Sequence, residues 1–187
     1  MSPVESNPFD KLYEERIVFL GSEIDDEVAG AVTAKLIQLE GADPDRVIEI
    51  YVNSPGGSLT AMLAIYDTMQ QVRPQIRTVC LGQAVSAAAL ILAAGTPGMR
   101  ACLPHARLLI HQPVLGRVAG AASDVRIAAD EASRMRRLME TAFARHTGKS
   151  PEEIHADIER EKVLTAEQAK EYGIVDEVVP SRKVSRR

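Results

Sequence analysis

Tryptophan is absent from this chain of 187 residues, and aromatic residues make up only 4% of it. Proteins that bind single-stranded nucleic acid stack bases on aromatic rings, so this scarcity argues against that class. The net charge of −4 points the same way, because a phosphate-binding surface needs an excess of Lys and Arg. With 45% hydrophobic and 26% charged residues, the composition is that of a soluble globular protein with an aliphatic, alanine-rich core.

Long apolar runs and paired cysteines are also lacking. The longest apolar run, 87–94, is far shorter than the roughly 20 residues that span a bilayer, and the polar start over 1–10 does not resemble a secretory signal. Cys80 and Cys102 have neither metal-ligand nor redox spacing. We therefore predict a cytoplasmic protein with no membrane contact, no metal and two buried free thiols.

Strand and helix patterns alternate along a chain whose length suits one domain, 1–187. Short apolar or β-branched runs predict strands, and apolar residues at helical spacing predict helices. The predicted strands cover 16–20, 47–52, 76–81, 100–103, 107–111 and 174–179, and the helices cover 25–40, 59–69, 87–94 and 123–147, with further helices starting after Ser150 and Thr165. This order favours an α/β fold with parallel strands and right-handed crossovers.

The two ends and the long helix stand apart from that pattern. We expect a short flexible N-terminus over 1–8 and a basic, solvated tail over 180–187. At about 1.5 Å per residue, the helix over 123–147 extends beyond the core of a small domain. Part of it is therefore expected to pack on another subunit.

Ser86 ends the turn Gly82-Gln83-Ala84-Val85-Ser86, between a predicted strand and a predicted helix. There the hydroxyl is exposed, and the first N–H groups of the helix favour an anion, as an acyl-transfer nucleophile requires. An ordinary N-cap serine has the same sequence context. Gly56 and Gly57 follow the neighbouring strand, where two glycines let the backbone approach a ligand closely and offer its N–H groups.

His111 directly follows a buried strand pattern. It suits a general base for Ser86, although a buried, hydrogen-bonded histidine fits the same position. A Ser–His pair also needs a carboxylate that orients the imidazole. The spacing does not choose between four candidates, Asp157, Glu159, Glu161 and Asp176.

A series of motifs carries a resemblance that extends from about residue 9 to residue 179. In chain order they are Tyr51-Val52-Asn53-Ser54-Pro55-Gly56-Gly57-Ser58, Tyr66-Asp67-Thr68-Met69, Gly82-Gln83-Ala84-Val85-Ser86, Cys102-Leu103-Pro104, Ile110-His111-Gln112-Pro113, His146-Thr147-Gly148 and Ala169-Lys170-Glu171-Tyr172-Gly173-Ile174-Val175-Asp176. In order and spacing, this series resembles the family of Clp protease proteolytic subunits, ClpP.

The resemblance implies a crotonase-like α/β fold of repeated ββα units, from which the helix over 123–147 protrudes as a handle. Members are expected to stack two heptameric rings into a tetradecamer, whose chamber holds Ser–His–Asp sites that cut unfolded proteins. An AAA+ unfoldase of the ClpX, ClpA or ClpC type feeds the chamber and uses the ATP, since this chain has no phosphate-binding lysine loop. No metal or organic cofactor is implied.

Carried over residue by residue, the resemblance makes Ser86 the nucleophile and His111 the general acid and base. The oxyanion donors would be the backbone N–H groups of Gly57 and Ala87. The stretch that resembles the family's substrate-pairing strand contains Gly116 and Gly120.

The family's Glu-Arg-Asp appears here as Glu159-Arg160-Glu161, which puts Glu161 at the position of the orienting aspartate. A glutamate orients the histidine in some hydrolase triads, but its additional methylene adds about 1.5 Å of reach. Because a catalytic constellation tolerates only about 0.5 Å of error, we expect reduced or conditional peptidase activity.

An apolar pocket receives a loop of the ATPase in this family, and five of its residues are retained: Tyr51, Val79, Leu81, Leu103 and Val179. Glu49, Gln71 and Ala101 stand where the family usually has aromatic residues, each of which stabilises by roughly 1.5–3 kcal/mol when buried. The family's N-terminal axial loop also has little counterpart here. We therefore expect weak ATPase docking by this chain alone, and a mixed complex with a better-equipped paralogue.

Two other functions are compatible with these residues. A catalytically weak ring subunit would shape the chamber or the docking face; Glu161 and the altered pocket favour it, whereas the presence of both Ser86 and His111 speaks against it. A crotonase-type acyl-CoA enzyme shares the fold and an oxyanion hole of two backbone N–H groups, but does not require Ser86 and His111 together. Labelling of Ser86 without binding of a CoA ester would exclude it.

Overall fold

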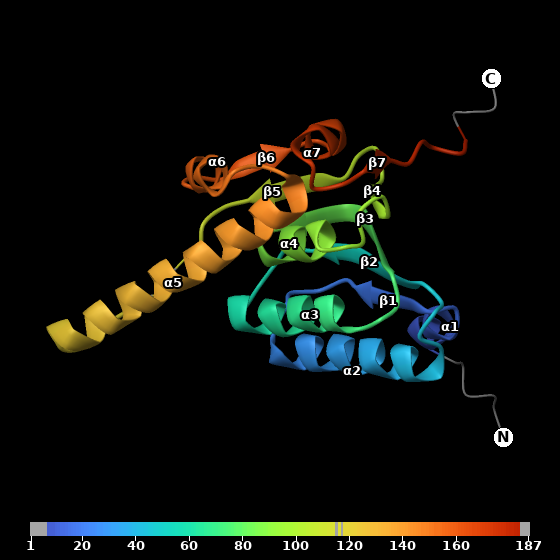
Figure 1. The fold of residues 1–187 in the computed structure, drawn as a ribbon, viewed down its shortest axis with the longest axis horizontal. Coiled ribbons are helices and arrows are strands. Elements are labelled where there is room, and N and C mark those ends of the chain that lie inside the picture. Colours follow the sequence, from blue (N-terminus) through green and yellow to red (C-terminus); the bar gives the residue numbers. More distant parts are fainter. Residues whose placement is uncertain (1–6, 115, 117, 184–187) are drawn as a thin grey trace.

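The computed structural model describes residues 7–114, 116 and 118–183. In this part of the chain, a seven-stranded sheet is combined with helices that pack against it (Figure 1). The strands are β1 (Ile17–Leu20), β2 (Ile48–Ser54), β3 (Ile76–Val85), β4 (Arg100–Cys102), β5 (Arg107–Ile110), β6 (Lys162–Leu164) and β7 (Glu177–Val178). The helices are α1 (Pro8–Glu14), α2 (Asp26–Ala42), α3 (Leu59–Gln71), α4 (Ala87–Ala93), α5 (Ala122–Thr147), α6 (Pro151–Asp157) and α7 (Ala166–Tyr172).

Most of the sheet is a parallel array in the order β1-β2-β3-β4-β7. The other two strands extend it from the far end of β3, where β5 pairs in parallel with β3 and β6 pairs antiparallel with β5. The prediction of parallel strands is therefore correct for the array and wrong for β6, which the sequence patterns did not reveal. Only three residues form β6, and Val163 at its centre is 52% exposed, so the strand has no apolar run.

β3 is longer than predicted, because residues 82–85 continue the strand instead of forming a turn. Residues 78–80 pair with β4 and residues 83–85 pair with β5, so the strand changes partners at Gly82. A side chain on Gly82 would come within 2.7 Å of Asn53 Oδ1, which accepts a hydrogen bond from Gln83 N at 3.2 Å. The predicted turn is thereby reduced to Ser86.

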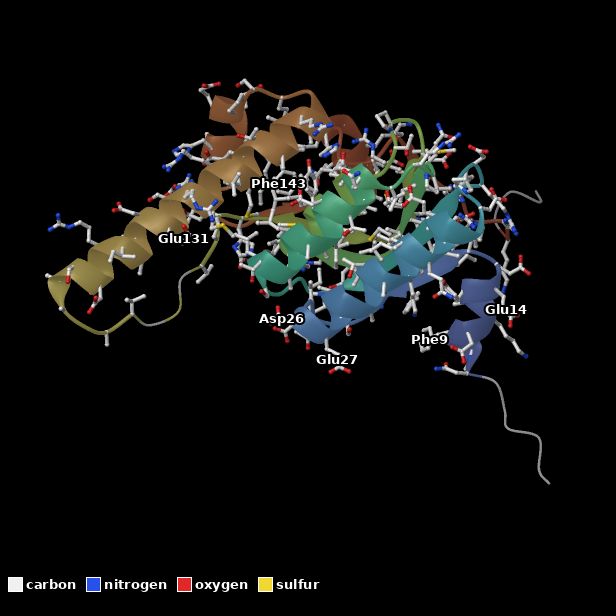
Figure 2. The ribbon with its side chains drawn as sticks, turned by 60° about the horizontal axis from the view of Figure 1, so that its bottom comes forward. Phe9, Glu14, Asp26, Glu27, Glu131 and Phe143 are labelled. Atoms are coloured by element: carbon white, nitrogen blue, oxygen red, sulfur yellow. The ribbon has the colours of Figure 1, made fainter. Side chains whose placement is uncertain are left out.

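The core is aliphatic, as predicted. β2 alternates buried residues such as Ile48 and Ile50 with partly exposed ones, and the apolar helix α4 is buried along its whole length. Among the described residues, the buried aromatic side chains are Tyr66, Phe143 and Tyr172. Figure 2 shows Phe143 where α5 meets the rest of the molecule. The scarcity of aromatics thus leaves a core built from branched aliphatic and alanine side chains.

The long predicted helix is α5, which begins at Ala122 and runs to Thr147. Its C-terminal half packs on the body through residues that include Met135 and Phe143, whereas no described residue of the helix before Met135 is buried. Figure 1 shows this first half projecting away from the sheet, and Ile127 on it is 67% exposed. None of the helices in the described ranges combines the length and the apolar composition that a membrane crossing requires.

The N-terminal helix α1 was not predicted. Asn7 caps it, because its side-chain oxygen accepts a hydrogen bond from Phe9 N at 3.1 Å, and Pro8 supplies a suitable first residue. The flexible segment expected over 1–8 therefore extends too far by residues 7 and 8, while residues 1–6 lie outside the described part.

Of the last predicted strand, 174–179, only the two residues of β7 form a strand. Ile174 is buried in the core, and Asp176 then turns toward β4. Its Oδ2 accepts hydrogen bonds from Gly98 N at 2.8 Å and from Arg100 N at 2.9 Å. Asp176 N also donates to Arg100 O at 2.7 Å, so both the backbone and the carboxylate of Asp176 bind the start of β4.

Both cysteines are buried and unpaired, as predicted. They are neighbours across β3 and β4, in register with each other. Burial raises the pKa of Cys80 to about 12, with the neighbouring thiol as a lesser cause, and raises the pKa of Cys102 to about 11. Thiols in this state stay protonated and are poor nucleophiles, so neither cysteine competes with Ser86 for a catalytic role.

Candidate active site

Ser86 forms a strained turn between β3 and α4. Its backbone has a φ of 56° and a ψ of −117°, a combination that L-residues rarely adopt. Ser86 N donates to Leu109 O at 2.7 Å, and Ser86 O accepts from Ala89 N at 3.0 Å. Ser86 stands at the N-cap position of α4, but within the described part of the chain its side chain makes no cap hydrogen bond, so it is not an ordinary capping serine. The residue is half-buried and lies at a strained strand-to-helix turn, which is the position of the serine in a nucleophile elbow.

β5 brings His111 to the same end of β3. Leu109, which accepts the hydrogen bond from Ser86 N, precedes His111 by two positions in the sequence. His111 is half-buried, and its imidazole has no hydrogen-bond partner among residues 7–114, 116 and 118–183. The alternative of a buried, hydrogen-bonded histidine is therefore wrong.

The antiparallel ladder of β5 and β6 ends at the pair of Ile110 and Lys162, one residue before His111 and one residue after Glu161. Beyond this pair, Gln112 N donates to Ile158 O at 2.7 Å, so the two segments stay adjacent in a different register. Glu161 is exposed, and its carboxylate has no hydrogen bond or ion pair with any described residue. It is thus free to turn toward the imidazole.

The three other candidate carboxylates form hydrogen bonds with cationic side chains. Each accepts a hydrogen bond from a cationic side chain: Asp157 from Lys162, Glu159 from Arg136 at 3.0 Å and Asp176 from Arg100 at 2.5 Å. Burial by itself raises the pKa of Asp157 and Asp176, but the hydrogen bonds and charges of Lys162 and Arg100 outweigh it and lower both pKa values. Among the four candidates within the described ranges, only Glu161 has a carboxylate without a hydrogen bond or ion pair.

The glycine loop after β2 lies against the turn of Ser86. A Cβ on Gly56 would be 2.5 Å from Val85 O and 3.1 Å from Ser86 Cβ, and one on Gly57 would be 2.3 Å from Ile24 O. Both glycines have positive φ, 92° and 151°, so only glycine suits this loop. The N–H groups of Gly57 and Ala87 have no acceptor in the described chain, as oxyanion donors require.

The predicted substrate stretch follows β5 and is exposed. Gly116 and Gly120 lie in it, and no strand is assigned to the described residues between Ile110 and Ala122. Gly120 has a φ of 157° and sits against the side chain of Asp124, which caps the start of α5. Residues 115 and 117 lie outside the described part. Gln112 N donates to Ile158 O at 2.7 Å, and the described residues that follow it are largely exposed.

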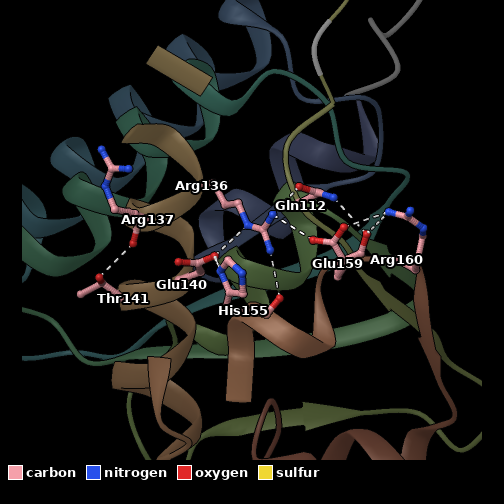
Figure 3. Close-up of polar contacts among 8 residues, drawn as sticks. All are labelled: Gln112, Arg136, Arg137, Glu140, Thr141, His155, Glu159 and Arg160. Atoms are coloured by element: carbon pink, nitrogen blue, oxygen red, sulfur yellow. Dashed lines mark hydrogen bonds and ion pairs between the residues drawn. The ribbon is translucent and has the colours of Figure 1, made fainter. Parts of the chain in front are cut away.

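A polar network that is not apparent from the sequence adjoins this site (Figure 3). At its centre, the Arg136 guanidinium donates to four oxygens: Gln112 Oε1 at 2.7 Å, Glu140 Oε1 at 2.8 Å, Glu159 Oε2 at 3.0 Å and His155 O at 3.0 Å. Gln112 directly follows His111, and Glu159 comes shortly before Glu161. The i,i+4 spacing of one ion pair on α5 is visible in the sequence, whereas the other contacts require the fold.

A pocket of about 980 Å³ opens on the exposed face of the sheet, beside β3, β4 and β7. Five of the predicted docking residues line it: Tyr51, Val79, Leu81, Leu103 and Val179. Glu49, Gln71 and Ala101 do not line it, which corrects their assignment to its wall. Ala101 is completely buried between β3 and β7, and Gln71 ends α3. Glu49 lies beside the pocket, where it contacts two lining residues, Arg77 through an ion pair at 3.4 Å and Tyr51.

The tail beyond β7 also contributes to this pocket. Pro180, Ser181 and Arg182 line it, although 180–187 was expected to be a flexible, solvated segment. The segment is not fully solvated because the apolar residues of the pocket wall give it a surface to pack against. Residues 184–187 are outside the described part.

Comparison with known proteins finds relatives that match nearly the whole chain. The Clp protease family matches residues 3–182. "ATP-dependent Clp protease proteolytic subunit 2" of Corynebacterium jeikeium is 63% identical over 181 residues, which cover 97% of this chain and 87% of that protein. "ATP-dependent Clp protease proteolytic subunit 3" of Nocardia farcinica is 63% identical over 182 residues (97% and 82%), and the subunit 1 of Corynebacterium glutamicum is 60% identical over 182 residues (97% and 88%). Likeness of this extent, over nearly the whole chain, shows that the protein belongs to the Clp protease family.

Proposed function

We propose that this chain is a Clp protease proteolytic subunit, a serine endopeptidase in which Ser86 attacks the peptide bond, His111 transfers the proton and Glu161 orients the imidazole. The observation that carries the proposal is the junction of β3 and β5, where the strained turn of Ser86 is bonded to Leu109, just ahead of His111. The relatives are named as proteolytic subunits, which supports the reaction class and speaks against an acyl-CoA enzyme.

The proposed reaction follows from these positions. His111 removes the proton of Ser86 as Oγ attacks the carbonyl carbon, and the oxyanion that forms accepts hydrogen bonds from the N–H groups of Gly57 and Ala87. One such donor lowers the barrier by about 3–4 kcal/mol. The protonated His111, stabilised by the carboxylate of Glu161, then gives its proton to the leaving amine. Water, deprotonated by His111, hydrolyses the acyl-enzyme and restores Ser86.

The subunit is further proposed to work in the cytoplasm, in two stacked heptameric rings that degrade unfolded proteins delivered by an AAA+ unfoldase of the ClpX, ClpA or ClpC type. The exposed first half of α5, with Ile127 on its surface, suits contacts between subunits. The names of the relatives number them as subunits 1, 2 and 3, which supports mixed assembly with a paralogue.

The pocket on the exposed face of the sheet is the proposed docking site for an apolar loop of the unfoldase. Tyr51 and Val79 are part of its apolar wall. At its edge, Arg77 forms ion pairs with Glu49 at 3.4 Å and with Glu177 at 3.5 Å. Because these charges must lose water when an apolar loop binds beside them, docking to this chain alone is proposed to be weak.

Treatment of the purified protein with a fluorophosphonate, alone and mixed with its paralogues, tests the proposed activity. We expect mass spectrometry to find one phosphonyl adduct, on the peptide that contains Ser86, because the reagent requires a serine activated by a base. Labelling only in the mixture would mean that activity depends on the paralogue. If neither sample is labelled although native mass spectrometry finds intact rings, this chain is a structural ring subunit and not an active protease.

Replacing Glu161 with aspartate is expected to raise peptidase activity. The shorter side chain removes about 1.5 Å of reach, and a misplacement of about 1 Å costs on the order of 100-fold in rate, so even partial relief of the misplacement should raise kcat by at least about tenfold. Glu161→Gln keeps the length but removes the charge, and should lower kcat. The measurement is hydrolysis of a fluorogenic peptide. An aspartate variant that is no faster than the original would show that Glu161 does not limit the reaction.

A further inference from the structure

The Arg136 side chain, on α5, forms hydrogen bonds with three other segments beside the candidate active site. It lies on the packed half of α5, its side chain is 19% exposed, and it contacts α6, the segment after α6 and the residue after His111. Figure 3 shows the guanidinium between Glu140 on one side and Gln112 and Glu159 on the other. Each of these bonds involves a charged donor, so each is roughly twice as strong as a bond between neutral groups.

Resting on the proposed function, we propose that Arg136 is a positioning residue that sets the distance between His111 and Glu161. Gln112 and Glu159 flank the two catalytic positions, and one guanidinium holds both side chains, through Gln112 Oε1 at 2.7 Å and Glu159 Oε2 at 3.0 Å. Neither His111 nor Glu161 is held by a side-chain hydrogen bond of its own within the described residues. Their placement therefore depends on the neighbours that Arg136 fixes.

The guanidinium is itself held in place from α5. Glu140 is buried, at 9% side-chain exposure, and its Oε1 accepts from Arg136 Nε at 2.8 Å and contacts His155 Nδ1 at 2.8 Å. A buried carboxylate with two such partners has little freedom to move. Arg136 Nη2 also donates to His155 O at 3.0 Å, which fastens the end of α6 to α5. The protruding helix is thereby connected to both catalytic positions.

Without Arg136, two weaker contacts would remain between the segments after β5 and after α6. Gln112 N donates to Ile158 O at 2.7 Å, and Gln112 Nε2 donates to Glu159 O at 3.0 Å. These bonds keep the backbones adjacent but leave the Gln112 amide and the Glu159 carboxylate without their shared donor. A lysine at this position offers three donors from a single nitrogen and cannot match the fork that reaches four oxygens.

The test compares Arg136→Gln and Arg136→Lys with Arg137→Gln as the control. Figure 3 shows the side chain of Arg137 pointing away from the network, and it has no side-chain partner among the described residues. We expect Arg136→Gln to lower kcat for a fluorogenic peptide by about 10- to 100-fold with KM changed less than about twofold, because positioning of the triad and not peptide binding is lost. The rate of fluorophosphonate labelling at Ser86 should fall in parallel, Arg136→Lys should recover part of both rates, and Arg137→Gln should match the original protein.

Two outcomes separate this inference from the proposed function. If the original protein is not labelled at Ser86, the proposed function fails; if it is labelled and Arg136→Gln is equally fast, the positioning role fails. A loss confined to KM would also overturn the positioning role. Should Arg136→Gln fail to form rings in native mass spectrometry, Gln112→Ala replaces it, because that variant keeps the ion pair of Arg136 with Glu140. It should lower kcat at least about fivefold, and an unchanged kcat would overturn the inference.

Discussion

Replacing Ser86 with alanine is expected to abolish peptide hydrolysis while leaving the fold intact. A triad without its nucleophile loses on the order of 10⁶-fold in kcat. The fold should persist because the hydroxyl caps no described backbone group, and the turn is held by the backbone bonds to Leu109 O and from Ala89 N. Hydrolysis of a fluorogenic peptide, together with the thermal midpoint Tm by circular dichroism, measures both effects.

Ser133→Ala is the matched control for this variant. The Ser133 hydroxyl donates to Ala129 O at 2.9 Å on the exposed part of α5, far along the chain from the turn of Ser86. It should leave hydrolysis unchanged. Retention of more than about a hundredth of the activity by Ser86→Ala, with Tm unchanged, would mean that another residue is the nucleophile.

Replacing Arg100 with methionine is expected to lower the free energy of unfolding by about 3–5 kcal/mol, because it leaves the partly buried Asp176 carboxylate and three carbonyl oxygens without their donor. Arg100 is only 7% exposed and donates to Asp176 through Nε at 2.9 Å and Nη2 at 2.5 Å. Its Nη1 also donates to the carbonyl oxygens of Ala93, His146 and Gly173. One side chain therefore joins the ends of α4, α5 and α7 to β4.

Urea denaturation at a fixed protein concentration measures this loss, since assembly adds to the apparent stability of the subunit. Arg73→Met is the control, because the Arg73–Asp45 pair has side chains that are 70% and 76% exposed and should contribute less than about 1 kcal/mol. Equal destabilisation by the two variants would show that burial does not strengthen the Arg100–Asp176 pair.

The same pair gives stability a dependence on pH. Burial by itself raises the pKa of Asp176, but the hydrogen bonds and charge of Arg100 outweigh it and hold the pKa below its ordinary value of about 3.9. As the pH falls, the Asp176 carboxylate is therefore protonated in the unfolded chain before it is protonated in the folded protein. The stabilisation by this pair is complete above the pKa of the unfolded chain, and it is lost as the pH falls through the lower pKa of the folded protein. In Arg100→Met this acid-dependent loss should be smaller.

Much of the fold is predictable because the responsible signals are local. Ser150 and Thr165 start α6 and α7 as expected, each with a side-chain oxygen that accepts an N–H of the first turn. The apolar run of α4 also folds as predicted. The second half of β3 was missed, because Gly82 and its neighbours resemble a turn and only pairing with β5 makes them a strand.

The candidate site likewise has residues that the sequence predicts and residues that only the fold identifies. Ser86, His111 and the paired glycines are identifiable from the sequence, since each stands at the end of a strand. Spacing alone left four acidic residues open, and only the family resemblance indicated Glu161. Which cations reach Asp157, Glu159 and Asp176 in space depends on the fold.

The sequence by itself determined the family and indicated Ser86 and His111 as the proposed nucleophile and base, since these reside in short motifs whose order the chain preserves. The tertiary structure decided which of the acidic candidates are engaged, because Lys162, Arg136 and Arg100 reach Asp157, Glu159 and Asp176 only in the folded chain. It also placed Arg136 beside Gln112 and Glu159. Such contacts arise when a sheet and a helix pack together, and no local pattern of residues encodes them.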